Sequence, residues 1–339
     1  MDLVEHVSPV NWSEQVVLIT GGTGCFGRKF VERMLHELHP KKLIVFSRDE
    51  SKQYRMRASG LNHPSLHYFA GDIRDAQRVQ RALSEVTVLI HAVTVGEIPD
   101  GEGDAFEAIQ TNVLGLRNVI EAAIDRGVQR FFALSTDQAV NPVTLGGATQ
   151  LCAEKMLVQA NSYSGGKKSR FSCVRYGSTF RSSAPLAWLS RQNPTCGEAS
   201  GIARSVSRFW VELDAAVQFV IRCIEQMDGG EIFVPKLPSV RLTHLHPIGW
   251  EREVPNINLI AEKSSEILIS QDEALNVIEL QDMYVIQPMH PAWHVKKWNG
   301  ARPVPERFCY SSDDNLLWLR PEELTSGLHE RSFLSGQMV

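Results

Sequence analysis

The stretch Val16-Val17-Leu18-Ile19-Thr20-Gly21-Gly22-Thr23-Gly24-Cys25-Phe26-Gly27 decides the fold. An apolar run leads into glycines at the spacing Gly-x-x-Gly-x-x-Gly, and a segment with helical periodicity follows from Phe26 to Leu38. Gly21 permits a tight turn, Gly24 lets the backbone approach a pyrophosphate, and Gly27 lets the helix pack closely on the strand. The start of the helix offers backbone N–H groups to the anion. A buried strand, this loop and a helix in that order predict a dinucleotide-binding unit.

Apolar runs and helical stretches continue to alternate through the first half of the chain. Further strands are expected at 42–46, 66–70, 87–91, 130–135 and 171–176, and helices at 104–126, 148–160 and 212–227. Short apolar runs separated by helices are typical of parallel strands that are buried on both faces. We therefore predict an α/β fold, a doubly wound parallel Rossmann sheet with a smaller, interleaved C-terminal substrate lobe.

Beyond residue 180 the pattern is broken into short pieces by prolines, among them Pro185, Pro235 and Pro255. We assign residues 1–177 to the Rossmann domain, to which 209–235 returns, and 178–208 and 236–339 to the smaller lobe and C-terminal extension. Near the end of the chain, Trp318–Leu324 resembles the start of a helix with Pro321 in its first turn.

Composition argues against several classes of protein. The net charge of -4 gives no support for nucleic acid as a partner. No run of about 18 apolar residues indicates a membrane span, and Met1–Gln15 lacks the apolar core of a signal peptide. The six cysteines form no Cys-x-x-Cys pair, and His244 and His246 are an isolated pair without metal-ligand spacing. We expect a cytoplasmic protein with reduced thiols, no metal and a small molecule as its partner.

The residues after the second strand indicate which dinucleotide binds. This segment reads Ser47-Arg48-Asp49-Glu50-Ser51-Lys52. Arg48 can form a charge-assisted fork to a 2′-phosphate, and Ser47 and Lys52 add donors. Asp49 would instead suit a ribose 2′-OH, so NAD stays the alternative to the favoured NADP. The other predicted cofactor contacts are Thr23, Cys25, Phe26, Asp72 and Ile73 beside the adenine, His91, for which a structural role is equally open, and Tyr176.

Motifs spread along the chain match one known family. They are Ile19–Gly27, Phe46–Glu50, Gly71–Asp75, Thr111–Gly115, Leu134–Asp137, Val174–Gly177, Arg208–Trp210 and Gly229–Lys236. On these residues the chain resembles the inverting UDP-N-acetylglucosamine 4,6-dehydratases, extended short-chain dehydrogenase/reductases of bacterial glycan biosynthesis. The resemblance implies that NADP⁺ takes a hydride from C4 of a sugar while a tyrosinate, its pKa lowered by a lysine, removes the hydroxyl proton. An Asp-Lys pair then handles the C5 proton and the departing C6 hydroxyl.

The chain departs from the family where that chemistry takes place. The family's Thr-Asp-Lys reads Thr136-Asp137-Gln138, and its Tyr-Gly-Ala-Thr-Lys reads Gly146-Gly147-Ala148-Thr149-Gln150. Glycine cannot take a proton, and a neutral glutamine neither titrates nor lowers a neighbour's pKa. A further lysine of the family is replaced by Gly96. The family's Arg-Pro-Gly-Glu-Lys-Leu-His-Glu segment is reduced to Ile260–Glu266, which puts the family's usual contacts with the diphosphate in doubt.

Two carboxylates remain as candidates for proton transfer. The resemblance places Asp137 near the C4–C6 edge of a sugar, and Glu97 approaches from the facing loop. Together they suit elimination or epimerisation beside an existing carbonyl, although each is equally compatible with an inert, solvated carboxylate. Thr136 can donate a hydrogen bond to a sugar hydroxyl. Arg208, Ser178 and Arg181 are the predicted substrate contacts.

Three functions follow from this pattern. The first is an NADP(H)-binding enzyme of altered chemistry on a nucleotide sugar or a related activated small molecule. The second is a pseudoenzyme that binds NADP(H) and regulates or scaffolds an active relative, in a hetero-oligomer. The third is ordinary 4,6-dehydratase activity with a substitute base. The resemblance also implies a homo-oligomer that pairs through the helices at 104–126 and 148–160.

Overall fold

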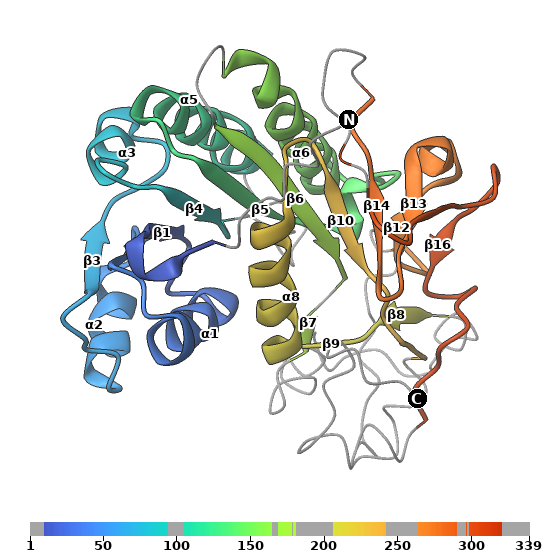
Figure 1. Cartoon of the computed structure of the whole chain (residues 1–339), viewed down its shortest axis with the longest axis horizontal. Coiled ribbons are helices and arrows are strands. Elements are labelled where there is room, and N and C mark those ends of the chain that lie inside the picture. The colour runs from blue at the N-terminus through green and yellow to red at the C-terminus, as the bar shows by residue number, and fades with distance from the viewer. Residues whose placement is uncertain are drawn as a thin grey trace, which may run out of the picture.

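A large, mainly parallel sheet forms the centre of the protein (Figure 1). The computed structural model describes residues 10–93, 105–164, 169–177, 179–180, 206–241, 263–289, 296 and 298–320. Within these residues the sheet has ten strands in the order β15-β13-β14-β10-β6-β5-β4-β1-β2-β3. The parallel strands are β1 (Val16–Thr20), β2 (Lys42–Ser47), β3 (Leu66–Ala70), β4 (Val88–His91), β5 (Arg130–Thr136), β6 (Arg170–Tyr176) and β10 (Ile232–Pro235). The predicted doubly wound α/β fold is confirmed.

Helices cover both faces of this sheet. They are α1 (Cys25–Arg33) with its π-helical continuation η2 (Met34–Leu38), α2 (Glu50–Ala58), α3 (Ala76–Ala82), α4 (Ala105–Ala108), the π-helical η3 (Ile109–Gly115), α5 (Leu116–Arg126), α6 (Leu145–Tyr163) and α8 (Leu213–Gln226). The helices α3, α5 and α6 pack against one another on one face, and α1 and α8 pack together on the other (Figure 1). Short 3₁₀ turns in the described part of the chain are η1 (Trp12–Glu14), η4 (Asp137–Ala139) and η7 (Gln271–Asn276).

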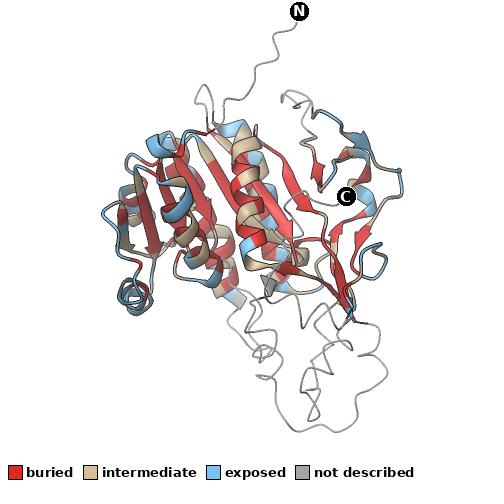
Figure 2. Cartoon of the chain, turned by 60° about the horizontal axis from the view of Figure 1, so that its bottom comes forward, coloured by how far each residue is buried: buried red, intermediate tan, exposed pale blue. Residues whose placement is uncertain are grey.

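The core lies between the sheet and these helices. All five residues of β1 are buried, and Leu18 and Ile19 expose at most 1% of their surface. Figure 2 shows the same contrast across the molecule, with buried strands inside and exposed outer faces on the helices. Apolar residues buried on both faces of a strand are typical of a parallel sheet, which is why the continuous apolar runs predicted these strands.

Three antiparallel strands extend the sheet beyond β10. They are β14 (Met283–Ile286), β13 (Val277–Glu279) and β15 (Arg302–Pro303), paired in that sequence from β10 outward. The sheet therefore continues past residue 236, where the sequence analysis began a smaller lobe, and the division of the chain into domains stays a prediction. The described residues also form three two-stranded sheets: β8 (Ser207–Phe209) with β11 (Ser239–Arg241), β12 (Ile267–Ile269) with β16 (Tyr310–Ser311), and β7 (Thr179–Phe180) with β9 (Val211–Glu212). Trp318 forms an isolated bridge with Ser239, and Leu319 and Arg320 are not helical, whereas residues 321–324 of the helix expected there lie outside the described residues.

A buried ion cluster joins the sheet to the added strands. Arg175 on β6 exposes 1% of its side chain, and its guanidinium donates to both carboxylate oxygens of Glu154 on α6, at 2.7 and 2.6 Å. The same guanidinium donates to both oxygens of Glu273 on η7, at 2.9 and 2.7 Å, and to the carbonyl of Leu268. All five N–H groups of an arginine can form hydrogen bonds, so Arg175 links three elements that are far apart in the sequence.

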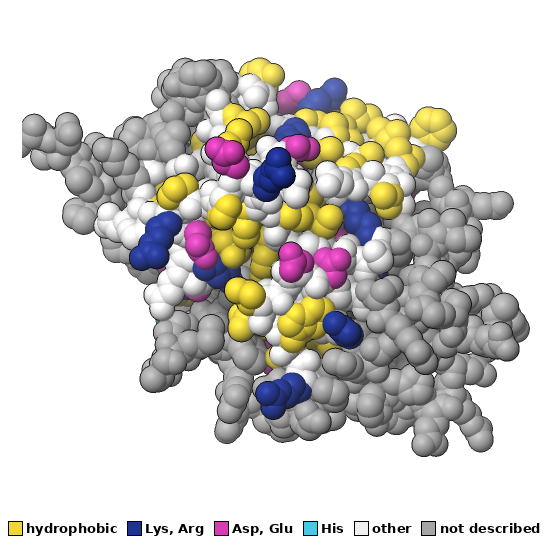
Figure 3. Space-filling view, turned by 90° about the vertical axis from the view of Figure 1, so that its right-hand side faces the viewer, with side chains coloured by type: hydrophobic (Ala, Val, Ile, Leu, Met, Phe, Trp, Pro, Cys, Tyr) yellow, Lys and Arg dark blue, Asp and Glu magenta, His cyan; other side chains and the backbone are white. Residues whose placement is uncertain are grey.

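The surface beside β13 and β16 mixes hydrophobic, acidic and basic side chains, without a field of one sign (Figure 3). In the part of the chain that the structure describes, no helix combines the length and apolar character needed to cross a membrane. Among the same residues, no three His, Cys, Asp or Glu side chains gather as the ligands of a metal ion would.

Candidate functional site

The glycine loop joins the carboxyl end of β1 to the first turn of α1. Gly21 has a φ of +68°, and its N–H donates to the carbonyl of Phe46 on β2 at 3.0 Å. A Cβ on Gly21 would lie 2.5 Å from the carbonyl oxygen of Ala92, and one on Gly27 would lie 2.4 Å from Cα of Gly22. Only glycine fits at both positions. The loop therefore has the close backbone approach that the sequence analysis expected, while its role in binding stays a prediction.

Ser47 at the end of β2 contacts this loop, and charged residues follow it in the sequence. Thr23 Oγ1 and Ser47 Oγ lie 2.9 Å apart. Asp49 caps α2 by accepting from the N–H of Lys52 at 2.8 Å, and its carboxylate also pairs with the Lys52 ammonium at 3.4 Å. Arg48 exposes 60% of its side chain and pairs with Glu107 at 3.2 Å. Asp49 is thus engaged as a helix cap, whereas the guanidinium of Arg48 lies at the surface.

The end of β3 contributes Asp72, Ile73 and Arg74 to the same edge of the sheet. Asp72 accepts from the N–H of Arg74 at 2.9 Å and from its guanidinium at 3.0 and 2.6 Å. The side chain of Ile73 is buried beneath Gly115, where a Cβ would lie 2.8 Å from it. Asp72 therefore orients Arg74, and Ile73 has packing contacts that are independent of any ligand.

The remaining predicted cofactor residues differ in exposure. Cys25 is exposed, Phe26 is buried and stacks on Phe30, and Tyr176 is buried. His91 Nδ1 lies 2.8 Å from Thr20 Oγ1, and burial lowers the pKa of His91 to about 4. Since the ring is neutral near pH 7, His91 stabilises the β1–β4 pair through Thr20 and carries no charge toward a ligand.

Asp137 lies at the carboxyl end of β5, where η4 begins. Its Oδ1 accepts from the hydroxyl of Thr136 at 2.9 Å. Burial raises the pKa of the Asp137 carboxyl, and the Thr136 hydrogen bond and the charges of Lys263 and Arg208 only partly oppose this effect. An acid in such an environment stays protonated to a higher pH than a solvated aspartate and is suited to give up a proton.

A lysine from a distant part of the chain reaches this aspartate. Lys263 Nζ donates to the backbone carbonyl of Asp137 at 3.1 Å and to that of Val140. Burial lowers the pKa of Lys263, and the negative charges of Asp137 and Glu266 oppose that shift. A lysine therefore contacts the backbone of Asp137 although position 138 is glutamine.

Arg208 and Glu266 form the far side of this group. Arg208 Nε lies 3.8 Å from Glu266 Oε1, and Arg208 also donates to the carbonyls of Ser207 and Ser264. Glu266 Oε2 accepts from the N–H of Phe209 at 2.6 Å. A Cβ on Gly177 would lie 2.3 Å from Glu266 Oε2, so glycine at the end of β6 permits this carboxylate to approach. The structure thus brings Arg208, a predicted substrate contact, close to Asp137.

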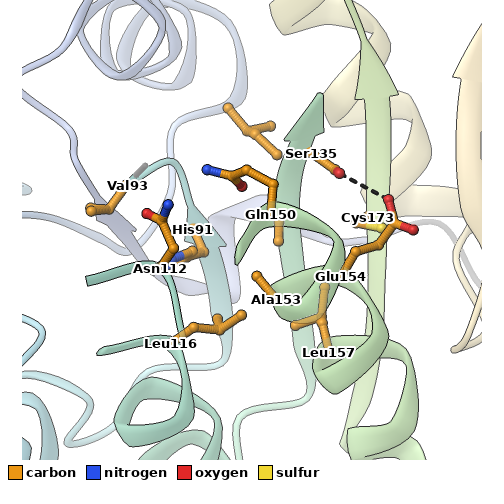
Figure 4. Close-up of a pocket in the computed structure, with 12 residues that line it drawn as sticks. His91, Val93, Asn112, Leu116, Ser135, Gln150, Ala153, Glu154, Leu157 and Cys173 are labelled. Carbon is orange, nitrogen blue, oxygen red and sulfur yellow. Dashed lines mark hydrogen bonds between the residues drawn. The ribbon is translucent and has the colours of Figure 1, made fainter. Parts of the chain in front are cut away.

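A small cavity lies where the resemblance places the family's lysine. Gln150 points into it from α6, with Asn112 on one side and the hydrogen-bonded pair Ser135 and Glu154 on the other (Figure 4). The cavity has about 20 Å³, enough for one water molecule. Gly146, at the position of the family's tyrosine, is half-buried in the first turn of α6. No ionisable side chain replaces the tyrosine or the lysine at these two positions.

Several predicted residues lie outside the described part of the chain. They are Gly96, Glu97, Ser178 and Arg181. Conversely, Lys263 and Glu107 lie at the site and were not predicted from the sequence. Lys263 was visible only within the shortened Ile260–Glu266 segment, and nothing in the sequence of the 104–126 helix marks Glu107.

Comparison with known proteins gives the lineage. The family described as polysaccharide biosynthesis protein matches residues 17–288. The chain belongs to this family. The inverting UDP-N-acetylglucosamine 4,6-dehydratase of Campylobacter jejuni is 38% identical over 92% of the chain and 97% of that enzyme. The UDP-glucose 4-epimerase of Rickettsia rickettsii is 32% identical over 80% of this chain and 83% of the epimerase. The resemblance predicted from the sequence motifs is therefore confirmed.

Solved structures of other proteins have the same fold as this chain, over different shares of its length. Pen from Bacillus thuringiensis has a TM-score of 0.82 at 29% identity and covers 94% of this chain and 98% of its own. DesIV, a dTDP-glucose 4,6-dehydratase from Streptomyces venezuelae, has a TM-score of 0.57 at 20% identity and covers 68% and 79%. The second comparison supports the fold alone. The relatives of this chain named above are thus nucleotide-sugar dehydratases and epimerases.

Proposed function

We propose that this chain binds NADP(H) and acts on a nucleotide sugar or a related activated small molecule, with Asp137 as its proton-transfer group. The observation that carries the proposal is the half-buried Asp137 carboxyl, whose pKa is raised, with Lys263 and Arg208 beside it. Asp137 follows β5, and the glycine loop follows β1. Ligands of open α/β sheets bind at the carboxyl ends of the strands, where both features lie.

The glycine loop fits a dinucleotide. There is no space for a side chain at Gly21 or Gly27. Gly24, the residue before α1, has no side chain that could cap the N–H groups in the first turn of this helix. The first turn of α1 is therefore suited to the pyrophosphate. A nicotinamide dinucleotide supplies hydride transfer when it is bound. NADP is favoured over NAD because Asp49 is engaged as a helix cap while Arg48 extends to the surface.

The missing tyrosine limits the chemistry that we propose. Without a base at Gly146 or a lysine at Gln150, proton removal from a sugar hydroxyl has no group at the family's positions. In elimination, Asp137 would give its proton to the departing hydroxyl, which leaves as water, while Glu97 would take the proton from the carbon beside a carbonyl that the substrate already carries. Lys263 would keep Asp137 in place through its backbone carbonyl, and Glu97 would be a second carboxylate. We also propose that the protein is cytoplasmic and forms a homo-oligomer. Light scattering would test the oligomeric state.

Incubation of the protein with NADP⁺ or NADPH and a panel of UDP-sugars and UDP-keto-sugars in deuterated water tests this function. We expect deuterium incorporation or loss of water from a keto-sugar, seen by mass spectrometry, and no reaction of UDP-N-acetylglucosamine. Loss of water from UDP-N-acetylglucosamine would show instead that the family reaction runs with a substitute base. Tight NADP⁺ binding without exchange or turnover of any sugar would support the non-catalytic, scaffolding role.

Lys263→Met is expected to move the Asp137 limb of the kcat/KM profile to higher pH. The positive charge of Lys263 lowers the pKa of Asp137, so its removal lets that pKa rise further. Because Asp137 acts as an acid, it then stays protonated to a higher pH, and the fall of kcat/KM with rising pH should begin later than in the wild type. Lys263→Arg keeps the charge and should leave the limb near its wild-type position. An unmoved limb in Lys263→Met would contradict the pairing.

Gly21→Ala is expected to weaken dinucleotide binding about tenfold or more, because the added Cβ would lie 2.5 Å from the Ala92 carbonyl. Gly60→Ala is the matched control. Gly60 also has a positive φ, +98°, but a Cβ there meets nothing within 4 Å. Both variants carry the strain of a left-handed alanine, of about 1–2 kcal/mol, and only Gly21→Ala should lose binding in calorimetric titration. Equal affinities in two folded variants would argue against this loop as the binding site.

A further inference from the structure

A single carboxylate lies between two arginines at the adenosine end of the predicted cofactor site. Glu107 Oε1 lies 3.2 Å from Nη1 of Arg48, which follows β2. Glu107 Oε2 lies 2.7 Å from Nη1 of Arg74, which follows β3. The hydroxyl of Thr111 also donates to Glu107 Oε1, at 3.4 Å. Glu107 comes from α4, so three separate elements meet around one negative charge.

The two arginines differ in how firmly they are held. The guanidinium of Arg74 is held by two hydrogen bonds to Asp72, and Arg74 exposes 38% of its side chain. Arg48 exposes 60%. Asp72 therefore orients the guanidinium of Arg74. The more exposed guanidinium of Arg48 can shift when a ligand binds. A carboxylate and a phosphate can each accept hydrogen bonds from two guanidinium groups arranged in this way.

We propose that Glu107 occupies the position of the cofactor 2′-phosphate, and that NADP(H) displaces it to bind Arg48 and Arg74 together. This inference rests on the proposed NADP(H) binding. A phosphate monoester carries a charge of about -1.5 to -2 at neutral pH, so it attracts the pair more strongly than one carboxylate does. Arg74 is then a second specificity residue for NADP, and Glu107 tunes the preference for NADP over NAD. NAD, which lacks the phosphate, leaves the Glu107 bridge intact.

Calorimetric titration of NADP⁺ and NAD⁺ into four variants tests this assignment. Glu107→Gln keeps the size of the side chain and removes the competing charge, so NADP⁺ should bind about fivefold more tightly. Arg74→Met should bind NADP⁺ about tenfold more weakly. In both variants the Kd for NAD⁺ should stay within about twofold of the wild type, because the contacts concerned are to the phosphate. Glu121→Gln and Arg117→Met are the matched controls, since these residues form an exposed ion pair on α5.

The outcomes separate this inference from the proposed function. If neither the wild type nor Glu107→Gln binds NADP⁺, both proposals fail. If the wild type binds NADP⁺ and Glu107→Gln binds it equally, Glu107 is an ordinary surface ion-pair partner and only this inference is overturned. Equal losses of NADP⁺ and NAD⁺ affinity in Arg74→Met would also overturn it, because they would indicate general damage around Asp72.

Discussion

Replacement of Asp137 by asparagine is expected to lower kcat/KM for the keto-sugar substrate about 100- to 10,000-fold, the range contributed by one positioned proton-transfer group. Asparagine keeps the shape and cannot release a proton. Burial raises the pKa of the Asp137 carboxyl, so a protonated acid is present above the pH at which a solvated aspartate ionises. The rate should fall as the pH rises through this pKa, and the limb should be absent from Asp137→Asn.

The stability of Asp137→Asn gives an independent check. A carboxyl whose pKa is raised in the folded state destabilises the protein once it ionises, so the variant should unfold at no lower temperature than the wild type at pH 7. NADP⁺ affinity should be unchanged. Asp214→Asn, which alters an exposed ion pair with Lys29, is the control for the loss of one charge. Wild-type kcat/KM in Asp137→Asn would remove Asp137 from the chemistry.

The strands of the central sheet could be predicted because their information is local. Each is a short apolar run, and burial on both faces makes that run continuous, as in Val16–Thr20. The helices α2 and α3 were not predicted, because each lies at the surface and buries only two side chains, Gln53 and Met56 in α2 and Val79 and Ala82 in α3. The antiparallel strands after residue 236 were missed as well. Their partners are distant, and their runs of two to four residues carry no period.

The candidate site shows the same division between local and long-range information. The glycine loop and Asp137 are local motifs and were named from the sequence. The loss of the family's lysine at Gln138 was also inferred from the sequence, but the sequence gives no sign that Lys263 reaches the adjacent carbonyl from 126 residues away. Glu107 is similar, since its two arginines follow different strands. Motifs compared position by position show which residue has changed, but not which side chains reach the same place from elsewhere in the fold.

Arg175→Met is expected to destabilise the protein by about 3–5 kcal/mol, the cost of leaving a buried charge without its partner. Glu154 exposes none of its side chain and Glu273 exposes 18%, and Arg175 holds both. Methionine fills much of the space but leaves two carboxylates without a counter-charge. Urea unfolding at pH 7, compared between variant and wild type, measures the loss. The control is Arg170→Met on the same strand, whose ion pair with Asp228 is at the surface and contributes about 1 kcal/mol or less.

The pH dependence identifies the cluster as the cause. Burial alone would raise the pKa of Glu273, but hydrogen bonds and charge from Arg175, with help from Ser270, outweigh burial and lower it. A carboxyl with a lowered pKa stabilises the fold above its unfolded pKa, about 4.3 for glutamate, and this contribution is lost as the pH falls through the folded value. The difference between wild type and Arg175→Met should therefore shrink below about pH 4. Should Arg175→Met fail to fold, Glu273→Gln, which leaves the Glu154 pair intact, gives the same trend with a smaller loss. A difference that is constant with pH would show that Arg175 stabilises the fold by packing and not through its charge.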